Sequence, residues 1–164
     1  MATKVSKAEA TRELERHWAE LRSVIESVPD EEIAQPGVVE EWSVKDIVGH
    51  IAFWADRGAA TLRASNAGSF EGLVWGEGET WVDDWNERES QVRKDKPYTE
   101  IRGEWLKAHE AARQALEGAS DETLDAPFRG HTVADFYIGD TYTHYKEHAG
   151  QIKAWLHEME TTEK

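Results

Sequence analysis

The chain has 164 residues, and we expect one domain spanning residues 1–164. Its formal net charge of -14 repels phosphate backbones and anionic lipid, so we expect neither nucleic acid nor a membrane surface as a partner. The absence of cysteine excludes disulfides, thiolate metal ligands and a protein thiol nucleophile, and a polar N-terminus without a long apolar run predicts a cytoplasmic protein.

Apolar residues recur with the 3.6-residue spacing of an amphipathic helix in four stretches. The first stretch covers residues 14–28. The second, over residues 43–62, begins with Ser43 and Asp46, which have the S-x-x-D spacing of a capping box. The link between them contains a Pro-Gly turn and predicts a short crossing from the first helix to the second.

A much longer link, residues 65–96, separates the second helix from the third. It opens with a glycine-rich loop and continues as an amphipathic stretch. The third and fourth helices are expected over residues 98–118 and 132–160, and no segment has the period of two that indicates a sheet. The sequence therefore predicts an all-α four-helix bundle with a long helix 2–helix 3 crossover carrying a short extra helix.

Two histidines lie on the inward stripe of the fourth helix, where leucine would be expected. They are His144 and His148, within the stretch THYKEHA. Residues four apart share a helix face with Cβ atoms about 6 Å apart, so both imidazoles can reach one ion. The alternative is a pair of hydrogen-bonded or surface histidines without a metal.

A third imidazole is available from His50, at the edge of the apolar stripe of the second helix. If the second and fourth helices are neighbours, three neutral imidazoles converge and leave a coordination position open, as in catalytic metal sites. Such a ligand set suits Zn²⁺, Ni²⁺ or Fe²⁺ alike. The other histidines have simpler interpretations: His17 is expected at the edge of the core, and His109, His131 and His157 are expected in solvent or loops.

Three carboxylates near these histidines are candidates for supporting roles. The string HYKEH matches the H-x-x-E-H pattern in which the glutamate is a base, so Glu147 is a minor candidate for that role beside its simpler reading as a solvated residue. Asp46 and Asp140 each precede a histidine by four residues and could accept its remaining N–H. For Asp46 we favour the capping role.

The glycine-rich loop lacks the lysine and hydroxyl residue of a phosphate-binding loop. It is either a flexible cover over one end of the bundle or a lid whose aromatic residues wall an apolar substrate pocket. The lid hypothesis places these residues around the pocket: Trp54, Phe70, Trp75, Trp81, Trp85 and Asn86.

Most of the chain resembles the DinB/YfiT-like superfamily of metalloenzymes. The resemblance rests on PGVVEEWSVKD, on the following GHIAFW, and on HYKEHAGQIKAWL. It implies a four-helix bundle in which His50, His144 and His148 hold a divalent metal ion. Members include S-transferases and isomerases that use mycothiol, bacillithiol or glutathione, which implies a low-molecular-weight thiol whose pKa the metal lowers.

The segment DWNE at residues 84–87 is also similar to the colibactin self-resistance family of four-helix bundles, whose activity does not depend on the histidine trio. Three hypotheses follow. The first is a metal-dependent enzyme that activates water or a thiol against an electrophilic small molecule, by hydrolysis or S-transfer. The second is a metal-free protein that binds such a molecule in an aromatic pocket. The third is a dimerisation bundle with no pocket near His50. A homodimer is compatible with all three.

Overall fold

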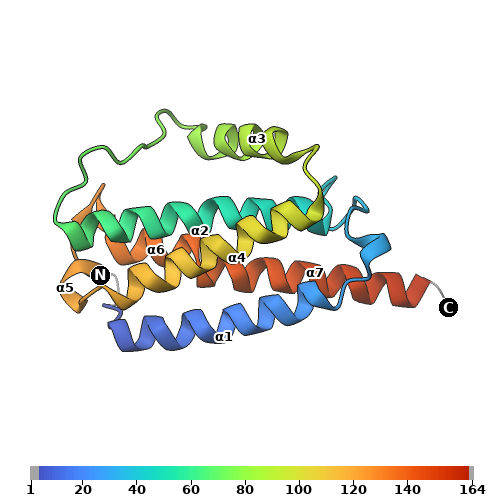
Figure 1. Cartoon of the computed structure of the whole chain (residues 1–164), viewed down its shortest axis with the longest axis horizontal. Coiled ribbons are helices and arrows are strands. Elements are labelled where there is room, and N and C mark those ends of the chain that lie inside the picture. Colours follow the sequence, from blue (N-terminus) through green and yellow to red (C-terminus); the bar gives the residue numbers. More distant parts are fainter. Residues whose placement is uncertain (1–3, 163–164) are drawn as a thin grey trace.

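The computed structural model describes residues 4–162, which form an all-α bundle (Figure 1). Its four long helices are α1 (Lys7–Glu26), α2 (Val44–Ala67), α4 (Tyr98–Glu117) and α7 (Tyr142–Thr162). The most extensive packing is between α2 and α4, and α1 packs on α7. A shorter helix, α6 (Val133–Asp140), covers another side of α2. The predicted fold class is therefore confirmed.

The capping box predicted for the second helix fixes the start of α2. The Ser43 hydroxyl accepts a hydrogen bond from the Asp46 backbone N–H at 3.1 Å, and the Asp46 carboxylate accepts one from the Ser43 backbone N–H at 2.9 Å. Both bonds satisfy N–H groups that a helix start leaves without partners. At the other end, Gly68 adopts a left-handed conformation (φ 78°) and closes the helix.

The long crossover has the predicted form. Figure 1 shows α2 and α4 running in the same direction, with the intervening chain returning along the outside of the bundle. This return contains the extra helix α3 (Trp81–Arg93), which packs on α2. The crossover therefore places a helix over the outer side of α2, and this arrangement becomes important at the candidate site.

The predicted fourth helix is divided into α6 and α7, which differs from the sequence-based expectation. The break falls at Thr141, whose ψ of -103° is not helical and whose hydroxyl donates to the Tyr137 carbonyl at 2.7 Å. Gly58 of α2 faces this junction, and a Cβ there would lie 3.0 Å from the Cβ of Asp140. The close approach of α2 to the junction accounts for a glycine at this position. The sequence has no proline at the break, and the apolar spacing continues through it. The sequence therefore predicted one continuous helix.

Several short elements also lay outside the prediction. They are the 3-10 helix η1 (Asp30–Glu32), α5 (Asp121–Leu124), and a hairpin of β1 (Pro127–Phe128) with β2 (His131–Thr132). Strands of two residues are too short to show a period of two in the sequence. Within the described residues, no helix combines the length and apolar character required to span a membrane.

His109 does not lie in solvent as the sequence predicted. Its ring stacks on Trp18 with centroids 3.7 Å apart, and its Nδ1 lies 3.0 Å from the Tyr145 hydroxyl. His17 is also buried, with Nε2 3.0 Å from a Glu13 carboxylate oxygen. The prediction for His109 was wrong because the α4 face beside Trp105 is covered by Trp18 of α1. The alanine-rich sequence around His109 did not indicate that Trp18 would pack over it.

Candidate metal centre

The three histidines singled out from the sequence lie together between α2 and α7. The Nε2 atom of His144 is 2.9 Å from Nε2 of His50 and 2.8 Å from Nε2 of His148. One nitrogen from each ring lies within 4.8 Å of the others, so the group could hold a metal ion. His148 is buried and the other two are half-buried. The stripe positions on the two helices thus converge on one point.

Burial keeps these imidazoles neutral. It lowers the pKa of His50 to about 3, with the charge of His148 acting in the same direction. It also lowers the pKa of His144 well below the ordinary value for histidine. The pKa of His148 is lowered by burial, while its hydrogen bond to Gln151 opposes the shift. Each ring therefore has a lone pair available at neutral pH, which is the form that binds metals.

Protons alone do not satisfy the three facing nitrogens. The Nδ1 of His148 lies 2.6 Å from the Gln151 amide oxygen, so it carries the proton and its Nε2 presents a lone pair. The Nε2 atom of His144 lies between the other two nitrogens. It carries either one hydrogen or one lone pair, so it cannot donate a hydrogen bond to His148 and also accept one from His50. The Nδ1 of His144 is buried without a hydrogen-bond partner among the described residues. A cation would accept all three lone pairs, so the donor set fits a divalent metal ion.

Gln151 is a functional candidate that the sequence analysis missed. It lies three residues after His148 on α7, and its carbonyl oxygen holds the imidazole in one tautomer and orientation. Metal-binding histidines usually donate their other N–H in this way. The spacing i, i+3 on one helix face was a signal that could have identified it.

The predicted supporting carboxylates lie in three different settings. One carboxylate oxygen of Asp46 accepts the hydrogen bonds of the capping box, and the residue also lines a pocket beside His50. Asp140 ends α6, where burial raises the pKa of its carboxyl to about 8 and nearby Arg57 opposes that shift. Glu147 is exposed on α7. Within residues 4–162, none of these three carboxylates accepts a hydrogen bond from a histidine of the cluster.

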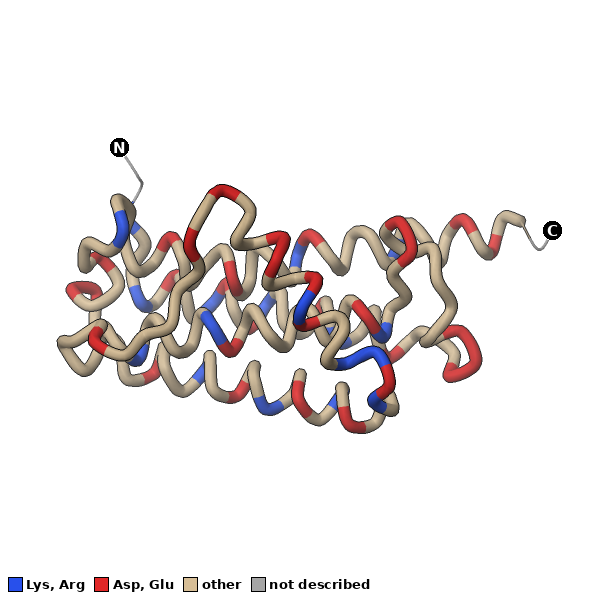
Figure 2. Tube along the Cα trace, turned by 90° about the horizontal axis from the view of Figure 1, so that it is seen from above, with Lys and Arg blue, Asp and Glu red and all other residues tan. Residues whose placement is uncertain are grey.

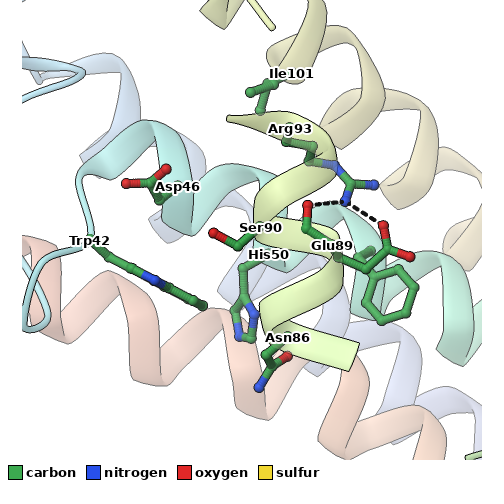
Figure 3. A pocket seen from close by; sticks show the side chains of 9 residues that line it. Trp42, Asp46, His50, Asn86, Glu89, Ser90, Arg93 and Ile101 are labelled. Atoms are coloured by element: carbon green, nitrogen blue, oxygen red, sulfur yellow. Dashed lines mark hydrogen bonds and ion pairs between the residues drawn. The ribbon is translucent and has the colours of Figure 1, made fainter. Parts of the chain in front are cut away.

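A pocket lies between α2 and α3 on the side of His50 (Figure 3). Its wall residues are Trp42, Asp46, His50, Phe53, Asn86, Glu89, Ser90, Arg93 and Ile101. The Trp42 ring meets the His50 ring edge-on with centroids 4.9 Å apart. Of the residues predicted to wall a pocket, Asn86 lines this one. The sequence did not indicate Trp42 or Phe53, because their role depends on where α3 lies.

The other predicted lid residues form an aromatic cluster with one another. Trp81 lies between Trp75 and Trp85, with ring centroids 5.5 Å and 5.2 Å away, and Trp85 lies 6.0 Å from Trp54. Phe70 stacks on Phe128 of the hairpin. These contacts attach the glycine-rich loop and α3 to the bundle. Whether the cluster also walls a ligand pocket stays a prediction.

Fold and site together define an all-α bundle with a candidate divalent-metal centre between its helices. The sequence profile of the DinB superfamily matches residues 13–152, and the chain belongs to this superfamily. No curated protein matches the chain. The resemblance inferred from the sequence motifs is therefore confirmed.

Solved structures share the fold at low sequence identity. An uncharacterised protein from Escherichia coli UTI89 matches with a TM-score of 0.82 and 16% identity, covering 94% of this chain and 95% of its own. The colibactin self-resistance protein ClbS, crystallised in complex with a dsDNA, gives 0.79 and 15%, covering 93% and 96%. DfsB, a sibling lethal factor precursor, gives 0.78 and 14%, covering 96% and 98%.

The expectation that nucleic acid is excluded as a partner was wrong. ClbS has this fold and is crystallised with dsDNA, so the fold itself is compatible with such a partner. Net charge averages over the whole surface, whereas contact with phosphates depends on the local field. Figure 2 shows Lys and Arg residues distributed among the more numerous acidic ones along the chain. The charge of -14 therefore does not decide the question.

Proposed function

We propose that this protein is a metal-dependent enzyme in which His50, His144 and His148 hold Zn²⁺, Ni²⁺ or Fe²⁺. The observation that supports the proposal is the meeting of three Nε2 atoms, 2.9 Å and 2.8 Å apart, in an arrangement that protons cannot satisfy. The low pKa of His50, about 3, keeps its lone pair free. Three imidazoles leave coordination positions open, as catalytic centres do.

The proposed reaction is nucleophilic attack on an electrophilic small molecule, by hydrolysis or by transfer to sulfur. A divalent ion at this site would lower the pKa of a bound water or thiol and supply a nucleophile near neutral pH. Because the chain has no cysteine, a thiol would have to be a low-molecular-weight one from solution. Gln151 fixes the tautomer of His148, and the Trp42 ring shields His50 from one side. Glu147 remains the proposed proton acceptor.

Metal content tests the proposal directly. Protein purified without a histidine tag is analysed for transition metals beside a His144→Ala/His148→Ala variant. We expect about one equivalent of metal in the wild type and less than a tenth of that in the variant, because two of three ligands are lost. Equal, negligible metal in both would remove the basis for the proposal. A His157→Ala variant controls for adventitious binding, because that histidine is exposed on α7.

A second candidate function is metal-free binding of an apolar or electrophilic molecule, as in self-resistance. The aromatic cluster of Trp54, Trp75, Trp81 and Trp85 favours it, as does the shared fold with ClbS. Here the tryptophans matter and the histidines are polar core residues. Tryptophan fluorescence during titration with an anilinonaphthalene sulfonate separates the two. Binding lost in Trp75→Ala but kept in His50→Ala favours this alternative.

The third hypothesis, a bundle that serves only dimerisation, predicts that no pocket lies near His50. The pocket between α2 and α3 includes His50 among its wall residues, so this third hypothesis has the least support.

A further inference from the structure

The orientation of the Asn86 side chain is fixed by a tryptophan. The indole Nε1 of Trp54 lies 2.7 Å from the Asn86 amide oxygen. An indole N–H can only donate, so the atom facing it must be the oxygen, and the Asn86 NH₂ group points away from Trp54. The two residues come from α2 and α3, so the bond also ties the crossover helix to the bundle.

The Asn86 NH₂ group has no hydrogen-bond acceptor within the part of the chain that the structure describes, although Asn86 lines the pocket beside His50. Asn86 and His50 line the same pocket, and in the view of Figure 3 their side chains are drawn beside one another. An amide with a fixed oxygen and two free hydrogens is a ready donor for an acceptor on a ligand. A ligand at this amide would lie beside a residue of the proposed metal centre.

Charges around the pocket disfavour an anionic ligand. Asp46 and Glu89 both line it, whereas the only cationic wall residue, Arg93, is already paired with Glu89 and Glu104 at 3.0 Å. Trp42 and Phe53 supply apolar surface. An anionic ligand would bury its negative charge here without a free cation to pair with it, whereas a neutral or cationic molecule would not.

The dimensions of the pocket restrict the ligand further. The space between the walls is narrow, with room for about one water molecule. A small ligand therefore enters only if α3 shifts outward, and α3 packs mainly on α2. The aromatic contacts of Trp85 with Phe53 and Trp54 are the packing that such a shift must loosen.

From these observations we propose that the Asn86 NH₂ group binds the carbonyl-type oxygen of a small neutral or cationic substrate in the pocket between α2 and α3, beside His50. Trp54 is a positioning residue that aims the amide. This inference rests on the proposed metal-dependent function and specifies the substrate class of the same site.

The test uses cobalt-substituted protein, whose visible bands report both metal binding and changes in coordination. Acetohydroxamic acid is the probe, because it is small, uncharged in neutral solution and bears a carbonyl oxygen. It releases its N–OH proton to the buffer when it binds a metal ion, so all affinities are compared at one pH. We expect Asn86→Ala to weaken its binding about five- to tenfold, which is the typical effect of losing one hydrogen bond. Cobalt content should stay unchanged.

Two variants separate a positioning effect from simple loss of packing. Trp54→Phe keeps an aromatic ring but removes the N–H, so we expect weakening of about threefold. The double variant Asn86→Ala/Trp54→Phe should bind no more weakly than Asn86→Ala, because Trp54 acts through Asn86. Val82→Ala, at an exposed position of α3 that does not line the pocket, should bind the probe like the wild type.

A matched pair of probes tests the charge preference. Butyrohydroxamic acid should bind at least tenfold more tightly than the succinic monohydroxamic acid, which adds a terminal carboxylate to a chain of similar length. Equal binding of both, or unchanged affinity in Asn86→Ala, would overturn the inference while leaving the metal site intact. Absence of cobalt bands in the wild type would instead overturn the proposed function, and this inference with it.

Discussion

Two regions of this bundle that contain buried histidines have different surroundings. His109 stacks on Trp18 and shares a hydrogen bond with the Tyr145 hydroxyl. The three rings of the candidate metal centre instead face one another, nitrogen to nitrogen. Burial lowers the pKa of His109 to about 4, so low pKa values occur in both regions. What distinguishes the centre is the convergence of lone pairs, and burial by itself does not indicate a site.

The largest effect that separates the two regions should come from metal removal. With metal at about 1,000 times its dissociation constant, the folded state gains about 4 kcal/mol, or about 8–16 °C in melting temperature for a chain of this size. We expect chelation to abolish this gain in the wild type and in His109→Phe alike. His144→Ala/His148→Ala should gain nothing from metal. A metal-dependent shift in that double variant would contradict the assignment.

Substitution of Gln151 should change the metal affinity of the candidate centre and leave the surroundings of His109 unchanged. We expect Gln151→Ala to lower metal affinity about 10–100-fold, because His148 loses the acceptor that holds its ring in place. Gln151→Glu keeps an acceptor oxygen and should restore most of the affinity. Competition with a chromophoric chelator measures both variants. Equal affinity in all three proteins would show that the hydrogen bond has no positioning role.

The pH dependence of stability should report on His109. Its pKa is about 4 in the folded protein and about 6.5 when unfolded. The folded state therefore binds fewer protons, and the stabilisation is complete above pH 6.5 and is lost as the pH falls toward 4. In that window His109→Phe should reduce the slope of unfolding free energy against pH by about 1 kcal/mol per unit. Urea titrations between pH 4.5 and 7.5 measure it, and parallel curves for both proteins would be inconsistent with a neutral His109.

The smallest effect is expected at Glu147, which is exposed beside His148. Glu147→Gln should change the unfolding free energy by no more than about 0.5 kcal/mol, as exposed substitutions usually do. Metal content should also stay at the wild-type level. A loss of metal would show that this glutamate supports the centre directly. The same variant in a turnover assay would test its proposed role as a base.

Local signals predicted much of the fold and the core of the site. The capping box at Ser43 predicted the start of α2, whereas the helix continues to Ala67, beyond the apolar stripe that ended at residue 62. His50, His144 and His148 were found because each occupies a stripe position where an apolar residue would be expected. The break at Thr141 could not be predicted, because it arises where α2 approaches the junction at Gly58.

The sequence by itself determined the family, the long helices apart from the break at Thr141, and the inward positions of His50, His144 and His148. Only the tertiary structure decided that His109 is covered by Trp18, that Gln151 orients His148, and that Trp42 and Asn86 meet His50 at one pocket. The physical reason is that periodicity reports which face of a helix is buried, but not which side chains bury it. Hydrogen-bond partners and pocket walls depend on how separate helices are placed, and here the long crossover decides where α3 lies.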